Sequence, residues 1–93
     1  MIPPYDLEIE KMVLGSIISY STAMNDVRDI INEDCFYDKF NADVFRAIKD
    51  LDDRGISIDM MQVNNELLKK YQLDELGRFI DIIGCSTFNV YDL

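Results

Sequence analysis

The segment from Phe36 to Asp59 constrains the fold more than any other part of the chain. Within it, apolar residues recur at the i, i+4, i+7, i+8, i+11 spacing of one helical face. These residues are Phe40, Val44, Ala47, Ile48 and Leu51. Phe45 lies roughly 60° beyond the edge of this face, so the apolar surface is broad. A helix with so broad an apolar surface contacts several neighbours, and the pattern therefore predicts the central helix of a small bundle.

Local signals mark the end of this helix and the start of the next one. Gly55 is expected to end the central helix, because a residue without a Cβ readily adopts the left-handed conformation that closes a helix. Asp59 and Gln62 have the spacing of a capping box, and Ile58 and Val63 have that of a hydrophobic staple. These signals predict a helix that begins near Met60. Its inward side chains are expected to be Met60, Val63, Leu67 and Tyr71.

A first helix is expected to begin at Asp6, which is a favoured N-cap residue. Its apolar arc comprises Leu7, Val13, Leu14, Ile17 and Ile18. Glu10 projects into the same arc, and we interpret it as a carboxylate at the rim of the core with a hydrogen-bonding partner. Gly15 costs roughly 1 kcal/mol against alanine in a helix interior. It therefore indicates close approach of another helix, with simple tolerance at the surface as the alternative.

A second, shorter helix is expected before the central one. The polar segment 19–22 would supply its cap, and residues 32–34 would end it. Its inward side chains are expected to be Ala23, Val27, Ile30 and Ile31. Two adjacent aromatic residues, Phe36 and Tyr37, follow Cys35 in the link to the central helix. We interpret both rings as parts of the core rather than as a platform on which bases stack.

A fifth helix is predicted near the C-terminal end of the sequence, with Asp74 as its N-cap and Gly84 at its end. Its inward side chains are expected to be Leu76, Phe79, Ile80 and Ile83. Residues 85–93 are too apolar for a solvated tail, and we interpret them as the truncated start of a helical hairpin or linker. The sequence thus predicts an all-α fold in one domain of residues 1–93, a small orthogonal bundle of about five short helices around a central helix.

The charge of the chain limits its partners. Eighteen acidic residues against nine basic ones give a net charge of −9. A surface of that sign repels a phosphate backbone, so we expect no direct nucleic-acid binding. It suits a basic protein partner, although simple solubility explains it equally well. No apolar run reaches the length of a membrane span, and we expect a cytoplasmic protein with no membrane contact.

The sequence lacks the motifs of common catalytic sites. It has no phosphate-binding loop and no histidine to act as a general base. Cys35 and Cys85 are far apart in the sequence and have no histidine with which to form a zinc site, so we expect them to be reduced thiols. The acidic groups at residues 33–34 and 50–53 lack the spacing of a calcium loop, and we interpret them as a solvated acidic surface. We therefore expect no catalytic residue, metal site or cofactor, and predict an acidic interaction domain rather than an enzyme.

In their order along the chain, these residues resemble the N-terminal domain of the DnaB-type bacterial replicative helicase. The opening PPYDLEIEKMVLGS is similar to that family's P-x-x-[L/I]-E-x-E-x-x-V-L-G-[S/A] pattern, and residues 36–59 are similar to its central pattern. Asn41 stands where the family commonly has histidine, Cys35 where it has aspartate, and Arg78 where a glycine is usual. The matching positions, which we expect to be structural, include Glu10, Gly15, Phe36, Tyr37, Phe45, Gly55 and Asp59.

The resemblance implies a non-catalytic collar domain of a hexameric helicase that acts in the primosome during DNA replication. Its implied partners are the C-terminal domain of primase, the helicase loader and sister collar domains. ATP and Mg²⁺ would be handled by a separate ATPase domain that this chain lacks. The alternative is a free-standing acidic helical adaptor, encoded by a phage or mobile element, that binds replication proteins. Candidate partner-surface residues are Arg78, Asp81, Phe88 and Tyr91.

Overall fold

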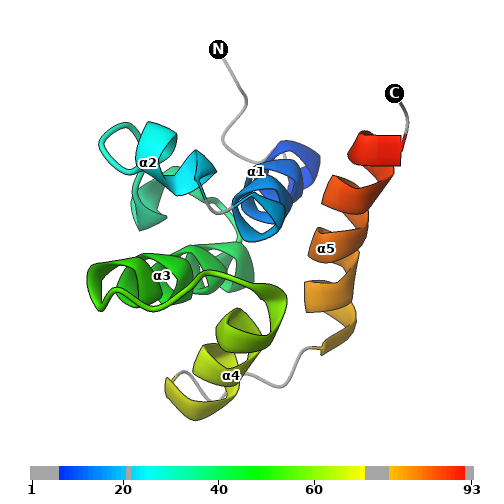
Figure 1. The fold of residues 1–93 in the computed structure, drawn as a ribbon. Coiled ribbons are helices and arrows are strands. Elements are labelled where there is room, and N and C mark those ends of the chain that lie inside the picture. The colour runs from blue at the N-terminus through cyan, green and yellow to red at the C-terminus, as the bar shows by residue number, and fades with distance from the viewer. Residues whose placement is uncertain (1–6, 21, 71–75, 92–93) are drawn as a thin grey trace.

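The computed structural model describes residues 7–20, 22–70 and 76–91, and in the last of these ranges it describes the side chains of residues 77–84. The described residues form helices and connecting turns, without a strand (Figure 1). The elements are α1 (Leu7–Ser19), α2 (Ala23–Val27), the short 3-10 helix η1 (Glu33–Cys35), α3 (Lys39–Asp53), α4 (Met60–Lys70) and α5 (Leu76–Tyr91). The predicted all-α fold is therefore confirmed.

α3 is a deeply buried helix, as its sequence pattern predicts, but α1 rather than α3 contacts all the other α-helices. At its start the Asp38 carboxylate accepts a hydrogen bond from the Asn41 amide at 3.1 Å. At its end Gly55 has a φ of +72°, the left-handed conformation expected there. Nine of its fifteen residues are buried, and Phe45 is among them. Because η1, α1 and α4 all contact α3, the broad apolar surface serves several neighbours at once.

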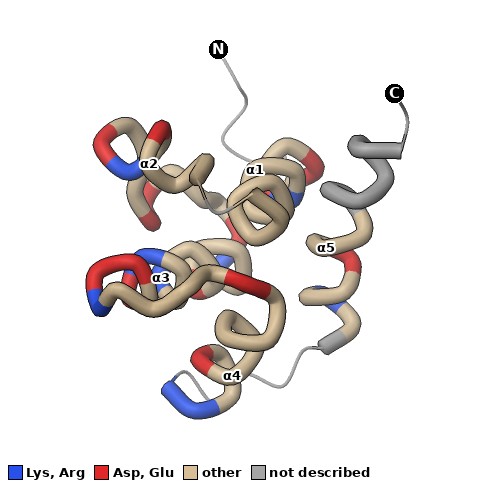
Figure 2. The backbone as a smooth tube through the Cα atoms, viewed as in Figure 1, with Lys and Arg blue, Asp and Glu red and all other residues tan. Residues whose placement is uncertain are grey.

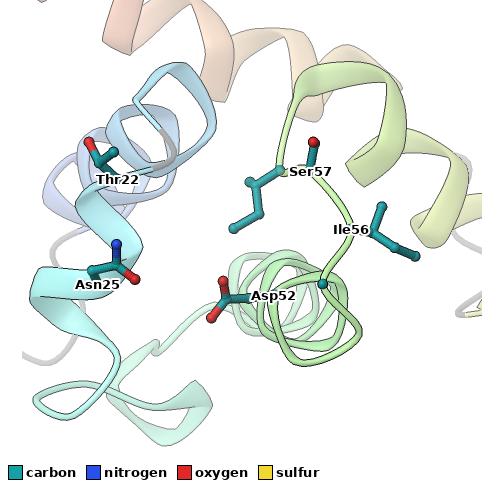
Figure 3. Close-up of a pocket in the computed structure, with 7 residues that line it drawn as sticks. Thr22, Asn25, Asp52, Ile56 and Ser57 are labelled. Carbon is teal, nitrogen blue, oxygen red and sulfur yellow. The ribbon is translucent and has the colours of Figure 1, made fainter.

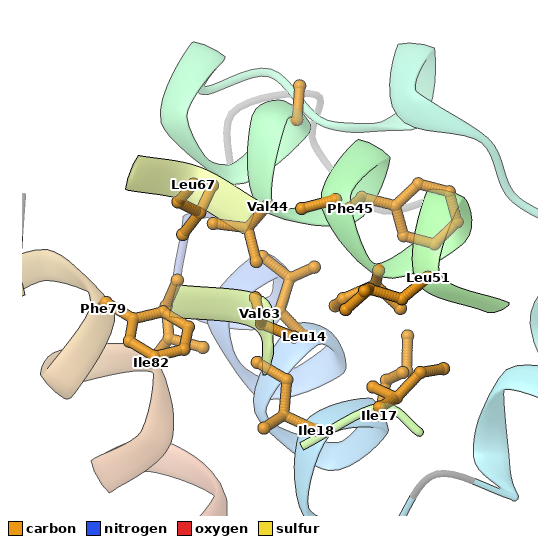
Figure 4. Packing of buried hydrophobic residues seen from close by; sticks show 14 of the residues in the cluster. Leu14, Ile17, Ile18, Val44, Phe45, Leu51, Val63, Leu67, Phe79 and Ile82 are labelled. Atoms are coloured by element: carbon orange, nitrogen blue, oxygen red, sulfur yellow. The ribbon is translucent and has the colours of Figure 1, made fainter. Parts of the chain in front are cut away.

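α1 contacts α2, α3, α4 and α5, and α4 also packs against α3 and α5. Figure 1 shows α1 lying between α2 and α5, and the most extensive contact of α1 is with α5. In the core, Leu14 and Ile17 of α1 lie close to Leu51 of α3 and Val63 of α4 (Figure 4). Gly15 is buried on α1, which agrees with the expected close approach of a neighbouring helix.

The predicted start of α4 is confirmed. The Asp59 carboxylate accepts a hydrogen bond from the backbone amide of Gln62 at 2.8 Å, which is the N-cap interaction that the sequence indicates. Ile58 and Val63, the expected staple pair, are both buried. Leu67 is buried one turn further along, so the inward face of α4 agrees with the prediction at these positions.

The second helix is shorter than predicted. α2 ends at Val27, and the next residues continue as hydrogen-bonded turns. Thr22, the residue before α2, is itself helical and its side chain makes no capping hydrogen bond, so Thr22 is not the cap; residue 21 of the predicted capping segment lies outside the described residues. Ile30 is 75% exposed rather than buried, and Met24 is the side chain of α2 that enters the core. A helix of little more than one turn shows too few repeats for periodicity to indicate the direction of the core.

Four further side chains that were expected in the core are exposed, namely Leu7, Tyr37, Met60 and Ile80. Leu7 and Met60 are the first residues of their helices. Phe36, next to Tyr37, is buried, with its ring centroid 5.2 Å from that of Phe45. Because Phe36 has an extended backbone and successive side chains of an extended chain point in opposite directions, only one ring of this pair reaches the core.

The last helix continues beyond its predicted end. Gly84 lies inside α5, which extends to Tyr91, so the prediction that Gly84 ends the helix is wrong. Ile82 rather than Ile80 is buried beside Phe79 (Figure 4). Residues 85–91 are helical, and their identification as the start of a hairpin stays a prediction, as does the single domain of residues 1–93. The predictions that lie outside the described residues concern Asp6, Tyr71, Asp74 and the side chain of Leu76.

Candidate functional site

A buried carboxylate joins α1 to the start of α3. Glu10 is 7% exposed, and its Oε2 accepts a hydrogen bond from the Tyr37 amide at 2.7 Å. Its Oε1 accepts hydrogen bonds from the Asn41 side-chain amide at 2.9 Å and from the Asp38 backbone amide at 3.4 Å. The prediction of a rim carboxylate with a hydrogen-bonding partner is confirmed.

The first turn of α3 explains why a carboxylate lies there. The first amide groups of a helix have no intrahelical acceptor, and the helix dipole favours negative charge at this end. Glu10 satisfies amides just before α3, and Asp38 satisfies the Asn41 amide inside its first turn. The Asn41 side-chain oxygen is buried and accepts no hydrogen bond. This network therefore fixes the angle at which the chain enters α3.

Ion pairs attach α5 to the rest of the bundle. The Asp81 carboxylate accepts a hydrogen bond from the Lys11 ammonium at 2.7 Å, and this contact, with Glu8 second, raises the pKa of Lys11. The Arg78 guanidinium pairs with Asp38 and lies 4.7 Å above the centroid of the Phe40 ring. Two candidate partner-surface residues, Arg78 and Asp81, thus have partners within the domain. The other two, Phe88 and Tyr91, have side chains outside the described residues.

The acidic end of α3 differs from the expected solvated surface. Arg28 lies 2.8 Å from an Asp52 oxygen and 3.2 Å from an Asp53 oxygen, which connects the turn after α2 to α3. Asp50 pairs with Arg54 at 3.1 Å and with Lys70 of α4 at 3.0 Å. These aspartates stay partly exposed and are also ion-paired across elements, so the predicted solvated surface at residues 50–53 is incomplete rather than wrong.

The same contacts shift two pKa values in this region. The hydrogen bond from Lys70 is the main cause of the lowered pKa of Asp50. The hydrogen bond to Glu66 is the main cause of the raised pKa of Arg54, and these two groups lie 2.6 Å apart. Both shifts favour the charged forms, so these pairs persist near neutral pH.

A polar recess lies where α2 faces the turn between α3 and α4 (Figure 3). Its volume is about 280 Å³, and its lining includes Thr22, Asn25, Asp52 and Ser57. The Asp52 carboxylate is already engaged by Arg28. Over the described part of the chain, no three histidine, cysteine or acidic side chains converge in a way that could hold a metal ion. The recess therefore offers hydroxyl and amide groups, but its lining residues do not form a recognisable catalytic arrangement.

An apolar groove lies between α1 and α2, and we call it the α1–α2 groove. Its volume is about 340 Å³. Its apolar lining consists of Ile9, Met12, Val13, Ile17, Ala23 and Val27, and Ser16 adds a hydroxyl group. The sequence analysis missed this surface. The signal was present, because residues 9, 12, 13, 16 and 17 have the i, i+3, i+4, i+7, i+8 spacing of a second face of α1.

Most of the family-matching positions have evident structural roles. Glu10, Gly15, Phe36 and Phe45 are buried. Gly55 and Asp59 mark the end of α3 and the start of α4. Tyr37 differs, since its ring is exposed while its backbone amide binds Glu10. In the described residues, no helix is long and apolar enough to cross a membrane.

Comparisons with known proteins agree with this architecture. The model of the DnaB-like helicase N-terminal domain family matches residues 2–90. The replicative DNA helicase DnaB of Rhodothermus marinus is 30% identical over 86 residues, which are 92% of this chain and 9% of that protein. The Geobacillus stearothermophilus DnaB is 33% identical over 76 residues, which are 82% of this chain and 17% of that protein. The chain thus spans less than a fifth of each relative.

A solved structure extends the similarity to three dimensions. The N-terminal domain of DnaB helicase from Mycobacterium tuberculosis superimposes with a TM-score of 0.79 at 29% identity, over 90% of this chain and 60% of that one. The match includes the helical architecture, and the family model covers almost the whole sequence. The chain therefore belongs to the DnaB-like helicase N-terminal domain family, the non-catalytic domain of replicative DNA helicases.

Proposed function

We propose that this domain is the N-terminal collar of a replicative DNA helicase and that it docks other replication proteins. The observation that carries the proposal is the family match over residues 2–90. The charge supports it as well, because a domain with a net charge of −9 repels DNA and suits basic protein surfaces. The partners proposed are the primase C-terminal domain, the helicase loader and sister collar domains in a hexamer.

In this proposal, ATP and Mg²⁺ are bound by a separate ATPase domain, as the resemblance implies. The collar contributes rigid surfaces rather than chemistry. The internal ion pairs of Arg28, Arg78 and Lys11 support this role, because they hold the helices in one arrangement. A partner that binds a preformed surface loses less conformational entropy than one that must order it first.

The test is co-elution in size-exclusion chromatography. The 93-residue chain is mixed separately with the cognate primase C-terminal domain, with the cognate loader and with more of itself at high concentration. A stable complex with at least one of them is expected. Absence of association with all three would remove the proposed role. The primase domain of a distant bacterium serves as the specificity control.

The adaptor alternative is distinguished by the reading frame downstream of Leu93. Continuation into a domain with a phosphate-binding loop supports the helicase collar, and an immediate stop codon supports a free-standing adaptor. ATP hydrolysis by the purified 93-residue chain would contradict both functions.

A further inference from the structure

The α1–α2 groove is an apolar depression at the surface of the described structure. Ile17 at its floor is buried in the core, whereas Met12 at its edge is 42% exposed. Val13, Ala23 and Val27 are partly buried and pack against the core. The groove is therefore a fixed apolar depression with one adaptable methionine at its edge, and such side chains suit protein-binding surfaces.

The dimensions of the groove match a helix. Ile9 and Ile17 are eight residues apart on α1, which is about 12 Å along the helix axis. A partner helix presents apolar side chains at i, i+3, i+4 and i+7 over about the same length. The groove walls are helices, so they offer no strand edge to an extended peptide.

The charges beside the groove select the partner. Glu8 lies about 40° beyond Met12 around α1, and Asp26 lies about 60° from Ala23 on the side away from buried Met24. Figure 2 shows acidic residues on both helices. Asp26 is exposed beside the groove on the α2 side, whereas the Glu8 carboxylate is paired with Lys11, which also binds Asp81 of α5.

The basic residues of this region do not neutralise it. Lys11 is shared between Glu8 and Asp81. Arg28 is likewise shared between Asp52 and Asp53. Each of these cations is therefore bound to two carboxylates other than Asp26, and the described ion pairs leave the negative charge of Asp26 beside the groove.

We propose that the α1–α2 groove binds the apolar face of a basic amphipathic helix supplied by a partner protein. Two or three apolar side chains fill the groove, and lysine or arginine residues beside them face Asp26. This inference deepens the docking role proposed above and rests on it, because it names the surface and the chemistry of the segment that is docked.

The test uses a defined probe, a helical peptide of about fourteen residues, or four turns. It carries leucine at i, i+3, i+4 and i+7 with lysines on both flanks. The 93-residue chain is labelled with ¹³C at its methionine methyl groups and titrated by NMR. The Met12 methyl signal is expected to shift and saturate, while the signal of Met61, 70% exposed on α4, stays in place. Movement of Met61 alone, or of neither signal, would overturn the proposal.

A matched pair of variants tests whether peptide binding depends on the groove or on the overall charge of the domain. Met12→Glu and Met61→Glu each add one negative charge at an exposed methionine. Met12→Glu is expected to weaken peptide binding at least about tenfold, because it places a charge against apolar side chains. Met61→Glu is expected to leave binding unchanged. Equal effects of the two would overturn the proposal. Both variants should keep the wild-type melting temperature, because both side chains are exposed.

The charge requirement has its own controls. Asp26→Asn, on α2 between the groove residues Ala23 and Val27, is expected to weaken binding several-fold at low salt, whereas Asp34→Asn, on η1, is not. A peptide with glutamate in place of every lysine should not bind, and equal binding by it would overturn the charge argument. A Met12 signal that moves when residues 2–6 are deleted, with no binding by the peptide, would identify the chain's own N-terminal segment as the occupant and overturn the proposal.

The cognate primase domain separates this inference from the proposed function. Primase binding that Met12→Glu leaves intact would overturn the groove as the site and keep the docking role. Peptide binding at Met12 without association with primase, loader or sister domains would keep the groove and overturn the collar role.

Discussion

At the scale of single residues, we expect the buried Glu10 carboxylate to contribute strongly to the stability of the fold. It accepts hydrogen bonds from the Tyr37 and Asp38 amides and from the Asn41 side chain. Glu10→Gln places an amide NH₂ group where one of these acceptors was, so a buried donor loses its partner. We predict that this change lowers the free energy of unfolding by about 1–3 kcal/mol. Urea denaturation followed by circular dichroism measures it.

The control for this prediction is Glu8→Gln, two positions earlier on the same helix. Its side chain is 74% exposed and pairs with Lys11 at the surface. A surface change of this kind should alter the free energy of unfolding by no more than about 0.5 kcal/mol. If the two variants lose equal stability, the Glu10 network does not fix the start of α3.

Gly15 is the second informative residue, because it is the buried glycine of α1. Gly15→Leu should lower the free energy of unfolding by about 1–3 kcal/mol, since the new side chain has to displace a packed neighbour. The matched control is Gly77→Leu, where an added Cβ meets no atom within 4 Å. Thermal melts that are unchanged for Gly15→Leu would mean that the helices do not approach closely at this position.

At the scale of elements, the continuation of α5 through Gly84 leads to a stabilising change. A Cβ added at Gly84 meets no atom within 4 Å, and glycine is a poor residue inside a helix. Gly84→Ala should therefore raise the free energy of unfolding by about 0.5–1 kcal/mol. Gly55→Ala should lower it by about 1 kcal/mol, because Gly55 has a φ of +72°. Destabilisation by Gly84→Ala would indicate that α5 ends there after all.

The stability that the Asp50–Lys70 ion pair contributes between α3 and α4 should depend on pH. The pKa of Asp50 in the folded state lies below its ordinary value of 3.8. A carboxyl group of this kind contributes stability above its unfolded pKa and loses it as the pH falls through the folded pKa. Asp50→Asn should thus be less stable than the wild type at neutral pH, and the difference should vanish in strong acid. Denaturant midpoints across the acidic range measure this.

The control is Asp34→Asn on η1, because Asp34 takes part in none of the ion pairs described above. Its difference from the wild type should not follow the same titration. A wild-type advantage over Asp50→Asn that persists in strong acid would contradict the assigned pairing with Lys70.

Features with local chemical causes could be predicted from the sequence. The cap at Asp59 and the left-handed Gly55 each depend on a few neighbouring residues, and both were correct. The exposed Ile30 and Tyr37 could not be predicted in this way, since their orientation depends on where distant helices lie. From the sequence, the aspartates of α3 could be assessed only within their own helix. Their cations, Arg28 and Lys70, come from other segments, so only the folded arrangement identifies the pairs.

At the scale of the whole molecule, many of the basic residues are ion-paired within the domain, and acidic residues remain in excess. Lys11, Arg28, Arg54, Arg78 and Lys70 all take part in ion pairs within the domain. Because the net charge is −9, the surface that remains repels nucleic acid and attracts basic proteins. The described part of the chain is acidic and has an apolar groove bordered by Asp26, and these properties suit a docking domain.

The most direct test of this account is a calorimetric titration of the 93-residue chain with the cognate primase C-terminal domain at several salt concentrations. The account predicts saturable binding that weakens as salt rises, because surface charges contribute less when they are screened. Absence of any heat of binding at low salt, under conditions in which both proteins are folded, would contradict primase docking.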